Sequence, residues 1–287
     1  MALDPALVCA EIARFLAEDV GGGDITTSSV VPEGARARGR LVAREACVVA
    51  GLALAREVFA QLDAGLQFAA LAEDGDAAPA GHVLVALAGF AAPMLTGERV
   101  ALNLLQRLSG VATLTRRYVQ AVAGTGATIS DTRKTTPGLR LFEKYAVQAG
   151  GGRAHRLGLF DAVLVKDNHI VAAGGLGAAV GALSRAPAGV SVQVEVDSLG
   201  QLETVLRGGV RAVLLDNMTP AVVAEAVRMV RASAGGGHCW IEASGGVTLA
   251  TVRAYAEAGV DTISVGALTH SAPSVDLAMD FEPHAGD

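Results

Sequence analysis

The sequence of 287 residues has little cysteine and no long hydrophobic run. Its three cysteines, Cys9, Cys47 and Cys239, lie far apart without a C-x-x-C motif, which argues against a disulfide framework or a cysteine metal site and predicts buried free thiols. The longest uncharged stretches contain glycine, proline or short alanine runs, whereas a bilayer requires about 20 strongly apolar residues. Acidic residues flank the first apolar stretch, whereas a signal peptide begins with basic ones. The sequence therefore predicts a cytoplasmic protein without a membrane segment.

Lysine is also scarce, and the few lysines lie close together. Of 23 basic residues only three are lysines, Lys134, Lys144 and Lys166, all near the middle of the chain. Because arginine is preferred elsewhere, the retained lysines suggest a site that uses compact ammonium groups. The net charge of −6 argues against non-specific nucleic-acid binding. The sequence also lacks a G-x-G-x-x-G motif after an early strand, which argues against a dinucleotide-binding fold.

The first third of the chain has the pattern of a small α/β domain. Partial alternation of apolar residues predicts a strand at 36–44, a short apolar run predicts another at 47–50, and a turn followed by a strand is expected at 74–89. Apolar residues at helical spacing then predict one long or broken helix from Thr96 to Ala123, with Thr96 as its N-cap.

From Ala127 onward, short apolar runs alternate with helical stretches, as βα units require. Strands are predicted to begin at Ala127, Ala162, Val192, Ala212, Trp240 and Thr262. Helices are expected at 137–148, 199–206, 221–231 and 249–258. We therefore predict an α/β protein with a C-terminal irregular βα (TIM-like) barrel and a smaller N-terminal α/β sandwich domain. The expected boundaries are 1–110 for the N-terminal domain with its linking helix, 111–270 for the catalytic barrel, and 271–287 for a C-terminal tail placed against the N-terminal domain.

Charged or small residues follow every predicted strand of the barrel. The loops at the carboxyl ends of barrel strands converge on one mouth, where the chemistry of such folds takes place. Along the chain these strand ends supply Thr132, Arg133, Lys134 and Lys166, then Glu195 and Asp216, then Ser244, Gly245, Gly246, Val265, Gly266 and Ala267. A solvated strand end or an internal ion pair explains any one of them equally well. Their succession suggests one long anionic ligand across the mouth.

The chemistry of the side chains divides this ligand into parts. Two or three cationic groups fit a dicarboxylate, since a guanidinium binds a carboxylate through two parallel bonds. The cationic group consists of Arg133, Lys134, His155 and Arg156. The glycine-rich tripeptides at 244–246 and 265–267 expose backbone amides, the first of them just before a helix predicted to begin near Thr248. The last loops of βα barrels often bind phosphate in this way.

Glu195 and Asp216 follow successive strands and have several candidate roles. They could bind a ribose diol, hold Mg²⁺ that bridges a pyrophosphate, or stabilise a developing cation. Lys166 could neutralise phosphate charge. The alternative for all three is a carboxylate and lysine pairing that only fills the barrel.

The segment from Asp131 to His169, DTRKTTPGLRLFEKYAVQAGGGRAHRLGLFDAVLVKDNH, resembles the signature of the quinolinate phosphoribosyltransferases. The similarity continues through EVDSLGQLE, LLDNMTP, EASGGV and SVGALTHS, and earlier through EDVGGGDITT and LNLLQRLSGVAT, so that it covers nearly the whole chain. One position departs from the pattern. Family members commonly have Asn before the His-Arg pair, where this chain has Ala154.

The resemblance implies transfer of phosphoribose from phosphoribosyl pyrophosphate to the ring nitrogen of quinolinate, then loss of the 2-carboxylate. The products are nicotinate mononucleotide, pyrophosphate and CO₂, in NAD biosynthesis, with Mg²⁺ as the cofactor. On the matching positions, Arg133, Lys134, His155 and Arg156 hold the carboxylates. Catalysis falls to Lys134, Lys166, Glu195 and Asp216, the last two as candidate metal ligands, and the glycine-rich segments bind the 5′-phosphate.

The resemblance also implies a homodimer with shared active sites, and it leaves higher assembly open. Arg99 matches an arginine that family members insert into the site of the neighbouring subunit. Three alternatives remain. A relative associated with molybdenum transport shares the PGxR and GGG…HR segments, although KDNH at 166–169 follows the quinolinate enzymes. An aldolase type would use Lys166 as a Schiff-base lysine, and a non-catalytic sensor would bind a phosphoribosyl ligand without turnover.

Overall fold

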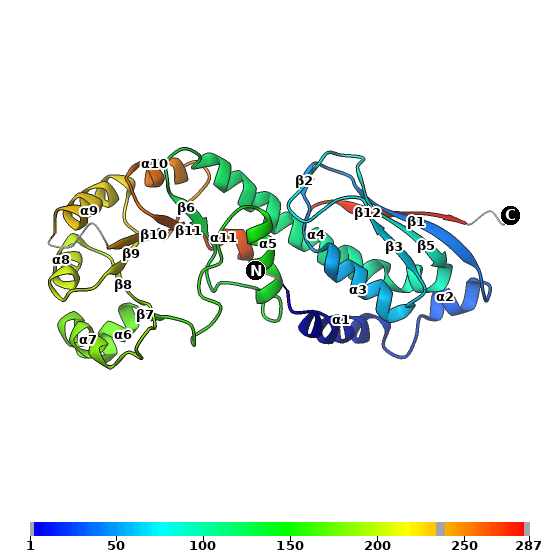
Figure 1. Ribbon diagram of the computed structural model, residues 1–287, viewed down its shortest axis with the longest axis horizontal. Coiled ribbons are helices and arrows are strands. Elements are labelled where there is room, and N and C mark those ends of the chain that lie inside the picture. The colour runs from blue at the N-terminus through cyan, green and yellow to red at the C-terminus, as the bar shows by residue number, and fades with distance from the viewer. Residues whose placement is uncertain (1–2, 234–238, 284–287) are drawn as a thin grey trace. The chain divides into compact units, whose positions relative to one another are not determined.

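The computed structural model describes residues 3–233 and 239–283 and contains two compact units (Figure 1). Within the described residues, the first unit is built from Met1–Arg116, Leu141–Gly151 and Ser271–Asp287, and the second from Arg117–Arg140 and Gly152–His270. Residues 284–287 of the predicted tail lie outside the described residues. No described helix combines the length and the apolar character needed to cross a membrane.

The first unit contains a four-stranded antiparallel sheet with the strand order β12-β1-β5-β3. These strands are β1 (Arg36–Ala43), β3 (Gln67–Ala70), β5 (Val83–Phe90) and β12 (Leu277–Pro283), and a separate pair is formed by β2 (Cys47–Val48) and β4 (Ala77–Ala78). Buried and exposed residues alternate along the first part of β1, because one face of the strand packs on the core. The C-terminal strand β12 therefore completes this sheet by pairing with β1, where Leu41 lies opposite Met279.

The helices of the first unit are α1 (Pro5–Val20), α2 (Ile25–Val30), α3 (Leu52–Leu62), most of α4 (Ala91–Ala121) and nearly all of α5 (Arg140–Ala149). On α1, Val8, Ile12 and Leu16 recur at helical spacing and are buried. This register leaves Cys9 on the outer face of α1. The prediction of a buried thiol is therefore wrong for Cys9, whereas Cys47 and Cys239 are buried free cysteines.

The long helix α4 begins earlier than the sequence predicts. It starts at Ala91, directly after β5, and Met94 in its first turn is already fully buried. Thr96 therefore lies inside the helix and is not its N-cap. Its hydroxyl instead donates a hydrogen bond to the carboxylate of Asp24, at 3.0 Å, and Asp24 caps α2.

The second unit contains a six-stranded parallel sheet with the order β6-β11-β10-β9-β8-β7. Its strands are β6 (Thr128–Ser130), β7 (Val163–Val165), β8 (Val192–Val196), β9 (Ala212–Asp216), β10 (Trp240–Ser244) and β11 (Thr262–Ser264). If the strands are placed around a closed barrel, neighbours in the barrel are also neighbours in the chain, and only β6 and β7 are not paired. This is the arrangement of an irregular βα barrel. All six predicted barrel strands are present, and the predicted fold class is confirmed.

Helices lie outside these strands, and successive helices pack side by side (Figure 1). They are α6 (Asp167–Ala172), α7 (Leu176–Ala182), the 3₁₀ turn η1 (Leu183–Arg185), α8 (Leu199–Arg207), α9 (Pro220–Ala232), α10 (Val252–Glu257) and α11 (Ala267–His270). One expectation is wrong. The helix predicted near Thr248 begins at Val252, because a turn closed by the bond from the Thr251 amide to the Thr248 carbonyl comes first.

The seam of the barrel, between β6 and β7, is closed partly by side chains. Among the described residues no ladder joins these two strands, and the segment at Arg153 instead forms a parallel bridge with Ser130. Nη1 of Arg156 donates to the carbonyl oxygen of Ala162, just before β7, at 3.2 Å. A long side chain therefore spans the gap that the backbone leaves.

Strand alternation determines which side chains enter the barrel. On β8, Val194 and Val196 are buried on the helix side, whereas Gln193 and Glu195 make polar contacts in the interior. The register of β10 with β9 aligns Glu242 with Leu214 and Ser244 with Asp216. Inward-facing residues of neighbouring strands therefore lie at the same height along the barrel axis.

We expect Gly110→Ala to destabilise the first unit. Gly110 lies on α4, where a Cβ atom would lie 2.0 Å from the backbone oxygen of Pro273, in the segment that leads to β12. Overpacking of this kind costs about 2 to 3 kcal/mol of unfolding free energy, measurable by urea denaturation. Gly22→Ala is the control, since nothing lies within 4 Å of its Cβ position. Equal midpoints for the two variants would contradict this packing.

Candidate active site

A cavity of about 330 Å³ opens at the carboxyl ends of the barrel strands. The predicted site residues that line it are Thr132, Arg133, Lys134, His155, Arg156, Lys166, Asp216, Ser244, Gly245 and Gly246. Residues that the site prediction did not include also line it, namely Leu164, Leu214, Asn217, Glu242 and Ser264. The structure therefore brings residues from well-separated parts of the second unit into one polar cavity.

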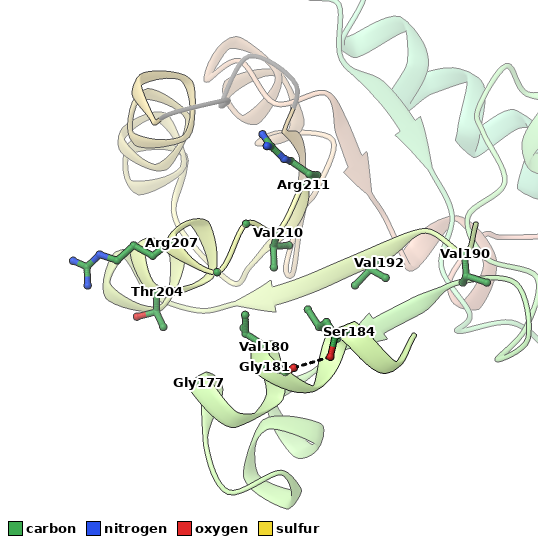
Figure 2. A pocket seen from close by; sticks show the side chains of 13 residues that line it. Gly177, Val180, Gly181, Ser184, Val190, Val192, Thr204, Arg207, Val210 and Arg211 are labelled. Atoms are coloured by element: carbon green, nitrogen blue, oxygen red, sulfur yellow. Dashed lines mark hydrogen bonds between the residues drawn. The ribbon is translucent and has the colours of Figure 1, made fainter. Parts of the chain in front are cut away.

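A larger cavity, of about 800 Å³, lies near the opposite ends of β8 and β9 (Figure 2). Its walls come from α7, α8 and neighbouring loops and are mainly aliphatic and glycine residues. Ser184 is bonded to the carbonyl of Gly181, and Arg207 points outward and pairs with Glu203. None of the described residues that line this cavity is a carboxylate, so this part of its wall lacks the acidic groups of the smaller cavity.

Two guanidinium groups form the cationic side of the polar cavity. The Nε atoms of Arg133 and Arg156 are buried and have no hydrogen-bond partner among the described residues. Burial, followed by the neighbouring charge of Arg133, lowers the pKa of Arg156. Because a buried donor without an acceptor is costly and two like charges repel, this pair favours an anionic ligand.

Lys166 and Glu195 form an ion pair at the mouth of the barrel. Nζ of Lys166 lies 2.6 Å from Oε2 of Glu195, whose side chain is only 11% exposed. Glu195 does not line the cavity itself and reaches it through Lys166. An ammonium that donates to a carboxylate is not a free nucleophile, which argues against a Schiff-base role for Lys166.

Asp216 ends β9 as a partly buried carboxylate. Burial raises its pKa, against the opposing charges of Lys166 and Lys134. The next residue, Asn217, donates from its side chain to Asp216 at 2.6 Å and has a φ of 54°, a left-handed conformation that asparagine tolerates. Gly245, with a φ of 94°, lies against Asn217, and a Cβ there would lie 2.2 Å from the Asn217 side-chain oxygen. Glycine is therefore required at this edge of the cavity.

Glu242 is a buried residue whose importance the sequence did not reveal. It is 3% exposed, in the middle of β10. It accepts hydrogen bonds from Ser264 and Gln193, and its Oε1 lies 3.3 Å from Nε2 of His155. Burial alone would raise the pKa of Glu242, but its hydrogen-bonding and charge interactions with His155, followed by hydrogen bonds from Ser264 and Gln193, bring it below the usual value. Glu242 is thus an ionised carboxylate behind the cavity.

The remaining predicted residues lie close to the cavity or in the other unit. Val265, Gly266 and Ala267 are absent from its lining, although a Cβ on Gly266 would lie 3.2 Å from Cδ of Lys134. Arg99 lies on α4 in the first unit, where it is exposed and has no hydrogen-bond or ion-pair partner among the described residues. Lys144 is a buried residue of α5 in that same unit.

Comparison with known proteins identifies the family. The family model described as "Quinolinate phosphoribosyl transferase, C-terminal domain" matches residues 111–280, and the model of the corresponding N-terminal domain matches residues 24–109. The chain belongs to the quinolinate phosphoribosyl transferase family. Two curated members support this assignment, both named "Probable nicotinate-nucleotide pyrophosphorylase [carboxylating]". The one from Synechocystis sp. is 46% identical over 94% of this chain and 91% of its own length, and the one from Bacillus subtilis is 43% identical over 93% and 91%.

Solved structures of the quinolinate phosphoribosyl transferase family have the same fold. The nicotinate-nucleotide pyrophosphorylase of Francisella tularensis superposes with a TM-score of 0.91 at 37% identity, covering 98% of each chain. NadC of Streptococcus pyogenes superposes with a TM-score of 0.92 at 39% identity, covering 99% of each chain. Ala154, the position that departs from the family pattern, does not line the polar cavity. It lines a second cavity, which shares His155, Arg156 and Glu242 with the polar one.

The site residues fit a magnesium ion that is delivered by a phosphate ligand. Among the described residues, no group of three or more His, Cys, Asp or Glu side chains could hold a metal alone. Mg²⁺ in nucleotide enzymes is commonly bound by one or two carboxylates together with substrate phosphates. The raised pKa of Asp216 marks a carboxylate that a nearby cation would stabilise. Asp216, with Glu195 nearby, therefore fits this type of metal site.

We expect Asp216→Asn to raise the melting temperature of the ligand-free protein at pH 7.5. The folded state raises the pKa of Asp216, so the ionised form destabilises the fold above that pKa, and the penalty disappears as the pH falls below about 4. The gain over the wild type should therefore shrink as the pH is lowered. Differential scanning calorimetry at several pH values measures it, with the exposed Glu225→Gln on α9 as the control. A lower melting temperature for Asp216→Asn at pH 7.5 would contradict this assignment.

Proposed function

We propose that the protein transfers the phosphoribosyl group of phosphoribosyl pyrophosphate to the ring nitrogen of quinolinate and then releases the 2-carboxylate as CO₂. The products are nicotinate mononucleotide and pyrophosphate, in the de novo synthesis of NAD. The observation that carries this proposal is the pair of buried, unpartnered guanidinium Nε atoms of Arg133 and Arg156 in a cavity with Lys134 and Lys166. A planar dicarboxylate satisfies such a pair. No observation favours the molybdenum-associated relative.

The arrangement supports the transfer step through positioning and charge. The ring nitrogen of quinolinate forms a bond to the anomeric carbon as the bond from that carbon to pyrophosphate breaks, and positive charge develops on the ribose. The carboxylates of Glu195 and Asp216 lie at the ends of neighbouring strands, β8 and β9. Their negative charge can stabilise the positive charge that develops on the ribose. Lys134 and Lys166 provide positive charge for the phosphates. When bound, Mg²⁺ supplies charge neutralisation to the leaving pyrophosphate.

Decarboxylation follows from the charge on the alkylated ring. Once the ring nitrogen is bonded to ribose it is positively charged, so it stabilises the electron pair that remains on C2 when the bond to CO₂ breaks. A proton then adds to C2. The step needs no separate electron-sink cofactor, and the protein has to hold the ring and screen its charges.

We also propose that the active enzyme is a homodimer with shared sites. Arg99 is an exposed arginine without a partner in the described part of the chain, and it matches an arginine that related enzymes insert into the neighbouring subunit. A third guanidinium in the site would add to the charge that faces the dicarboxylate.

The proposed reaction is tested by ¹⁴CO₂ release from quinolinate labelled in its 2-carboxylate. We expect release only when quinolinate, phosphoribosyl pyrophosphate and Mg²⁺ are all present, with one pyrophosphate formed for each CO₂. Omission of each component in turn is the control. Saturable binding of both substrates without release would show a sensor, and failure of the folded protein to bind quinolinate would overturn the substrate assignment.

Mixing two inactive variants tests the shared site. Arg99→Ala and Arg133→Ala chains should each be inactive, but a heterodimer contains one site with both arginines intact. After subunit exchange in a 1:1 mixture, we expect recovery of about a quarter of the wild-type activity, since half of the dimers carry one intact site of two. The control replaces the Arg133→Ala chain with an Arg99→Ala/Arg133→Ala double variant, which cannot complete any site. Equal activity of the mixture and its control would argue against sharing.

A further inference from the structure

The proposed chemistry leaves the buried carboxylate of Glu242, and its contact with the half-buried ring of His155, without a role. The carboxylate of Glu242 is held from three sides. Ser264 of β11 donates to Oε1, Gln193 of β8 donates to Oε2 at 2.9 Å, and Nε2 of His155 lies 3.3 Å from Oε1. Because these partners come from two strands and from the segment beside the seam, the carboxylate has little freedom to move.

Both nitrogens of the His155 ring are engaged by the protein. The backbone N–H of Arg156 donates to Nδ1 at 2.8 Å, so Nδ1 carries no proton in this arrangement. The ring proton is therefore on Nε2, which faces Glu242. The backbone N–H of His155 donates to Oδ1 of Asp131 at 2.7 Å. The residue is thus fixed through its main chain and through both sides of its ring.

We infer that Glu242 is a positioning residue, which fixes the Nε2–H tautomer of His155 and, through Nδ1 of that ring, the backbone of Arg156. This revises the expectation that the ring of His155 holds a substrate carboxylate: in this arrangement its ring proton faces Glu242, and the residue supports the guanidinium group of Arg156. The kinetic test of this inference rests on the proposed function, whereas its spectroscopic test does not.

The geometry around Arg156 explains why its support matters. Nη1 of Arg156 is bonded to the carbonyl oxygen of Ala162 across the barrel seam, and its buried Nε remains for a ligand. A bidentate bond to a carboxylate requires both the position and the orientation of the guanidinium plane. A small rotation of the Arg156 backbone would therefore weaken substrate binding without removing any group that contacts the substrate.

The spectroscopic test measures the protonation of the His155 ring directly. The full-length protein is labelled with ¹⁵N in its six histidines, and His155→Gln assigns the signal. At pH 7.5 we expect a protonated Nε2 and an unprotonated Nδ1, both before and after quinolinate is added. A doubly protonated ring, the Nδ1–H tautomer, or a change of ring protonation on adding quinolinate would overturn the inference. The ligand-free spectrum decides it even if quinolinate is not the substrate.

The kinetic test compares three variants in the assay of CO₂ release. Glu242→Ala leaves the Nε2–H of His155 without its acceptor and should raise the KM for quinolinate about tenfold, with kcat and the KM for phosphoribosyl pyrophosphate within about threefold of wild type. Glu242→Gln retains an amide oxygen as acceptor and should restore the KM for quinolinate to within about threefold. Gln193→Ala, the control, removes only the bond to Oε2, and its KM should also stay within about threefold.

The outcomes distinguish positioning from two other roles. A fall in kcat that is equally large in Glu242→Ala and Glu242→Gln would show that the charge or a proton of Glu242 takes part in the reaction, and it would overturn the inference. A lower melting temperature of Glu242→Ala with unchanged kinetic constants would show a purely structural role, and would also overturn it. Should Glu242→Ala not fold, the spectrum of the wild type and the kinetics of Glu242→Gln decide the question.

Discussion

The buried carboxylate of Glu242 is the interaction on which the interior of the barrel depends. An ionised carboxylate inside a protein is costly unless hydrogen-bond donors surround it. Here the donors come from β8, from β11 and from His155 beside the open seam. The strand order and the alternation of side chains must both be correct for these groups to meet. The same register that satisfies Glu242 places Ser244 beside Asp216 at the mouth, so the core and the site are aligned by one set of strand pairings.

Above this core, the site contains charges that repel one another when no ligand is bound. The buried Nε of Arg156 belongs to a guanidinium that lies close enough to Arg133 for their charges to interact, and burial raises the pKa of Asp216. In both cases the ionised form of the side chain is less favourable in the folded protein than in water. A ligand with two carboxylates and a pyrophosphate, accompanied by a cation, compensates each of them. Local instability of this kind is common in functional sites, where residues are selected for binding and catalysis at some expense of stability.

Much of the fold could be predicted from the sequence because the signals are local. Each barrel strand is a short apolar run, and most of the charged site residues that follow the runs line one cavity, whereas Glu195 reaches it through Lys166. The starts of α4 and α10 could not be predicted, because Ala91 and Met94 extend the buried face of α4 upstream of Thr96, and a turn at Thr248 delays α10. Glu242 was missed for a different reason. It lies in the middle of β10, and only its neighbours across the barrel, Gln193 and Ser264, distinguish it from the other acids of the barrel strands.

The support role of His155 agrees with the chemistry proposed for the site. In the decarboxylation step the positive ring nitrogen stabilises the electron pair on C2, so no acid is needed to draw electrons away from the breaking bond. A neutral ring whose proton is directed at Glu242 is consistent with this chemistry and still fixes the backbone of Arg156. The anionic substrate then meets fixed cations at the mouth, while the ionised carboxylate that organises them remains buried behind the ring of His155.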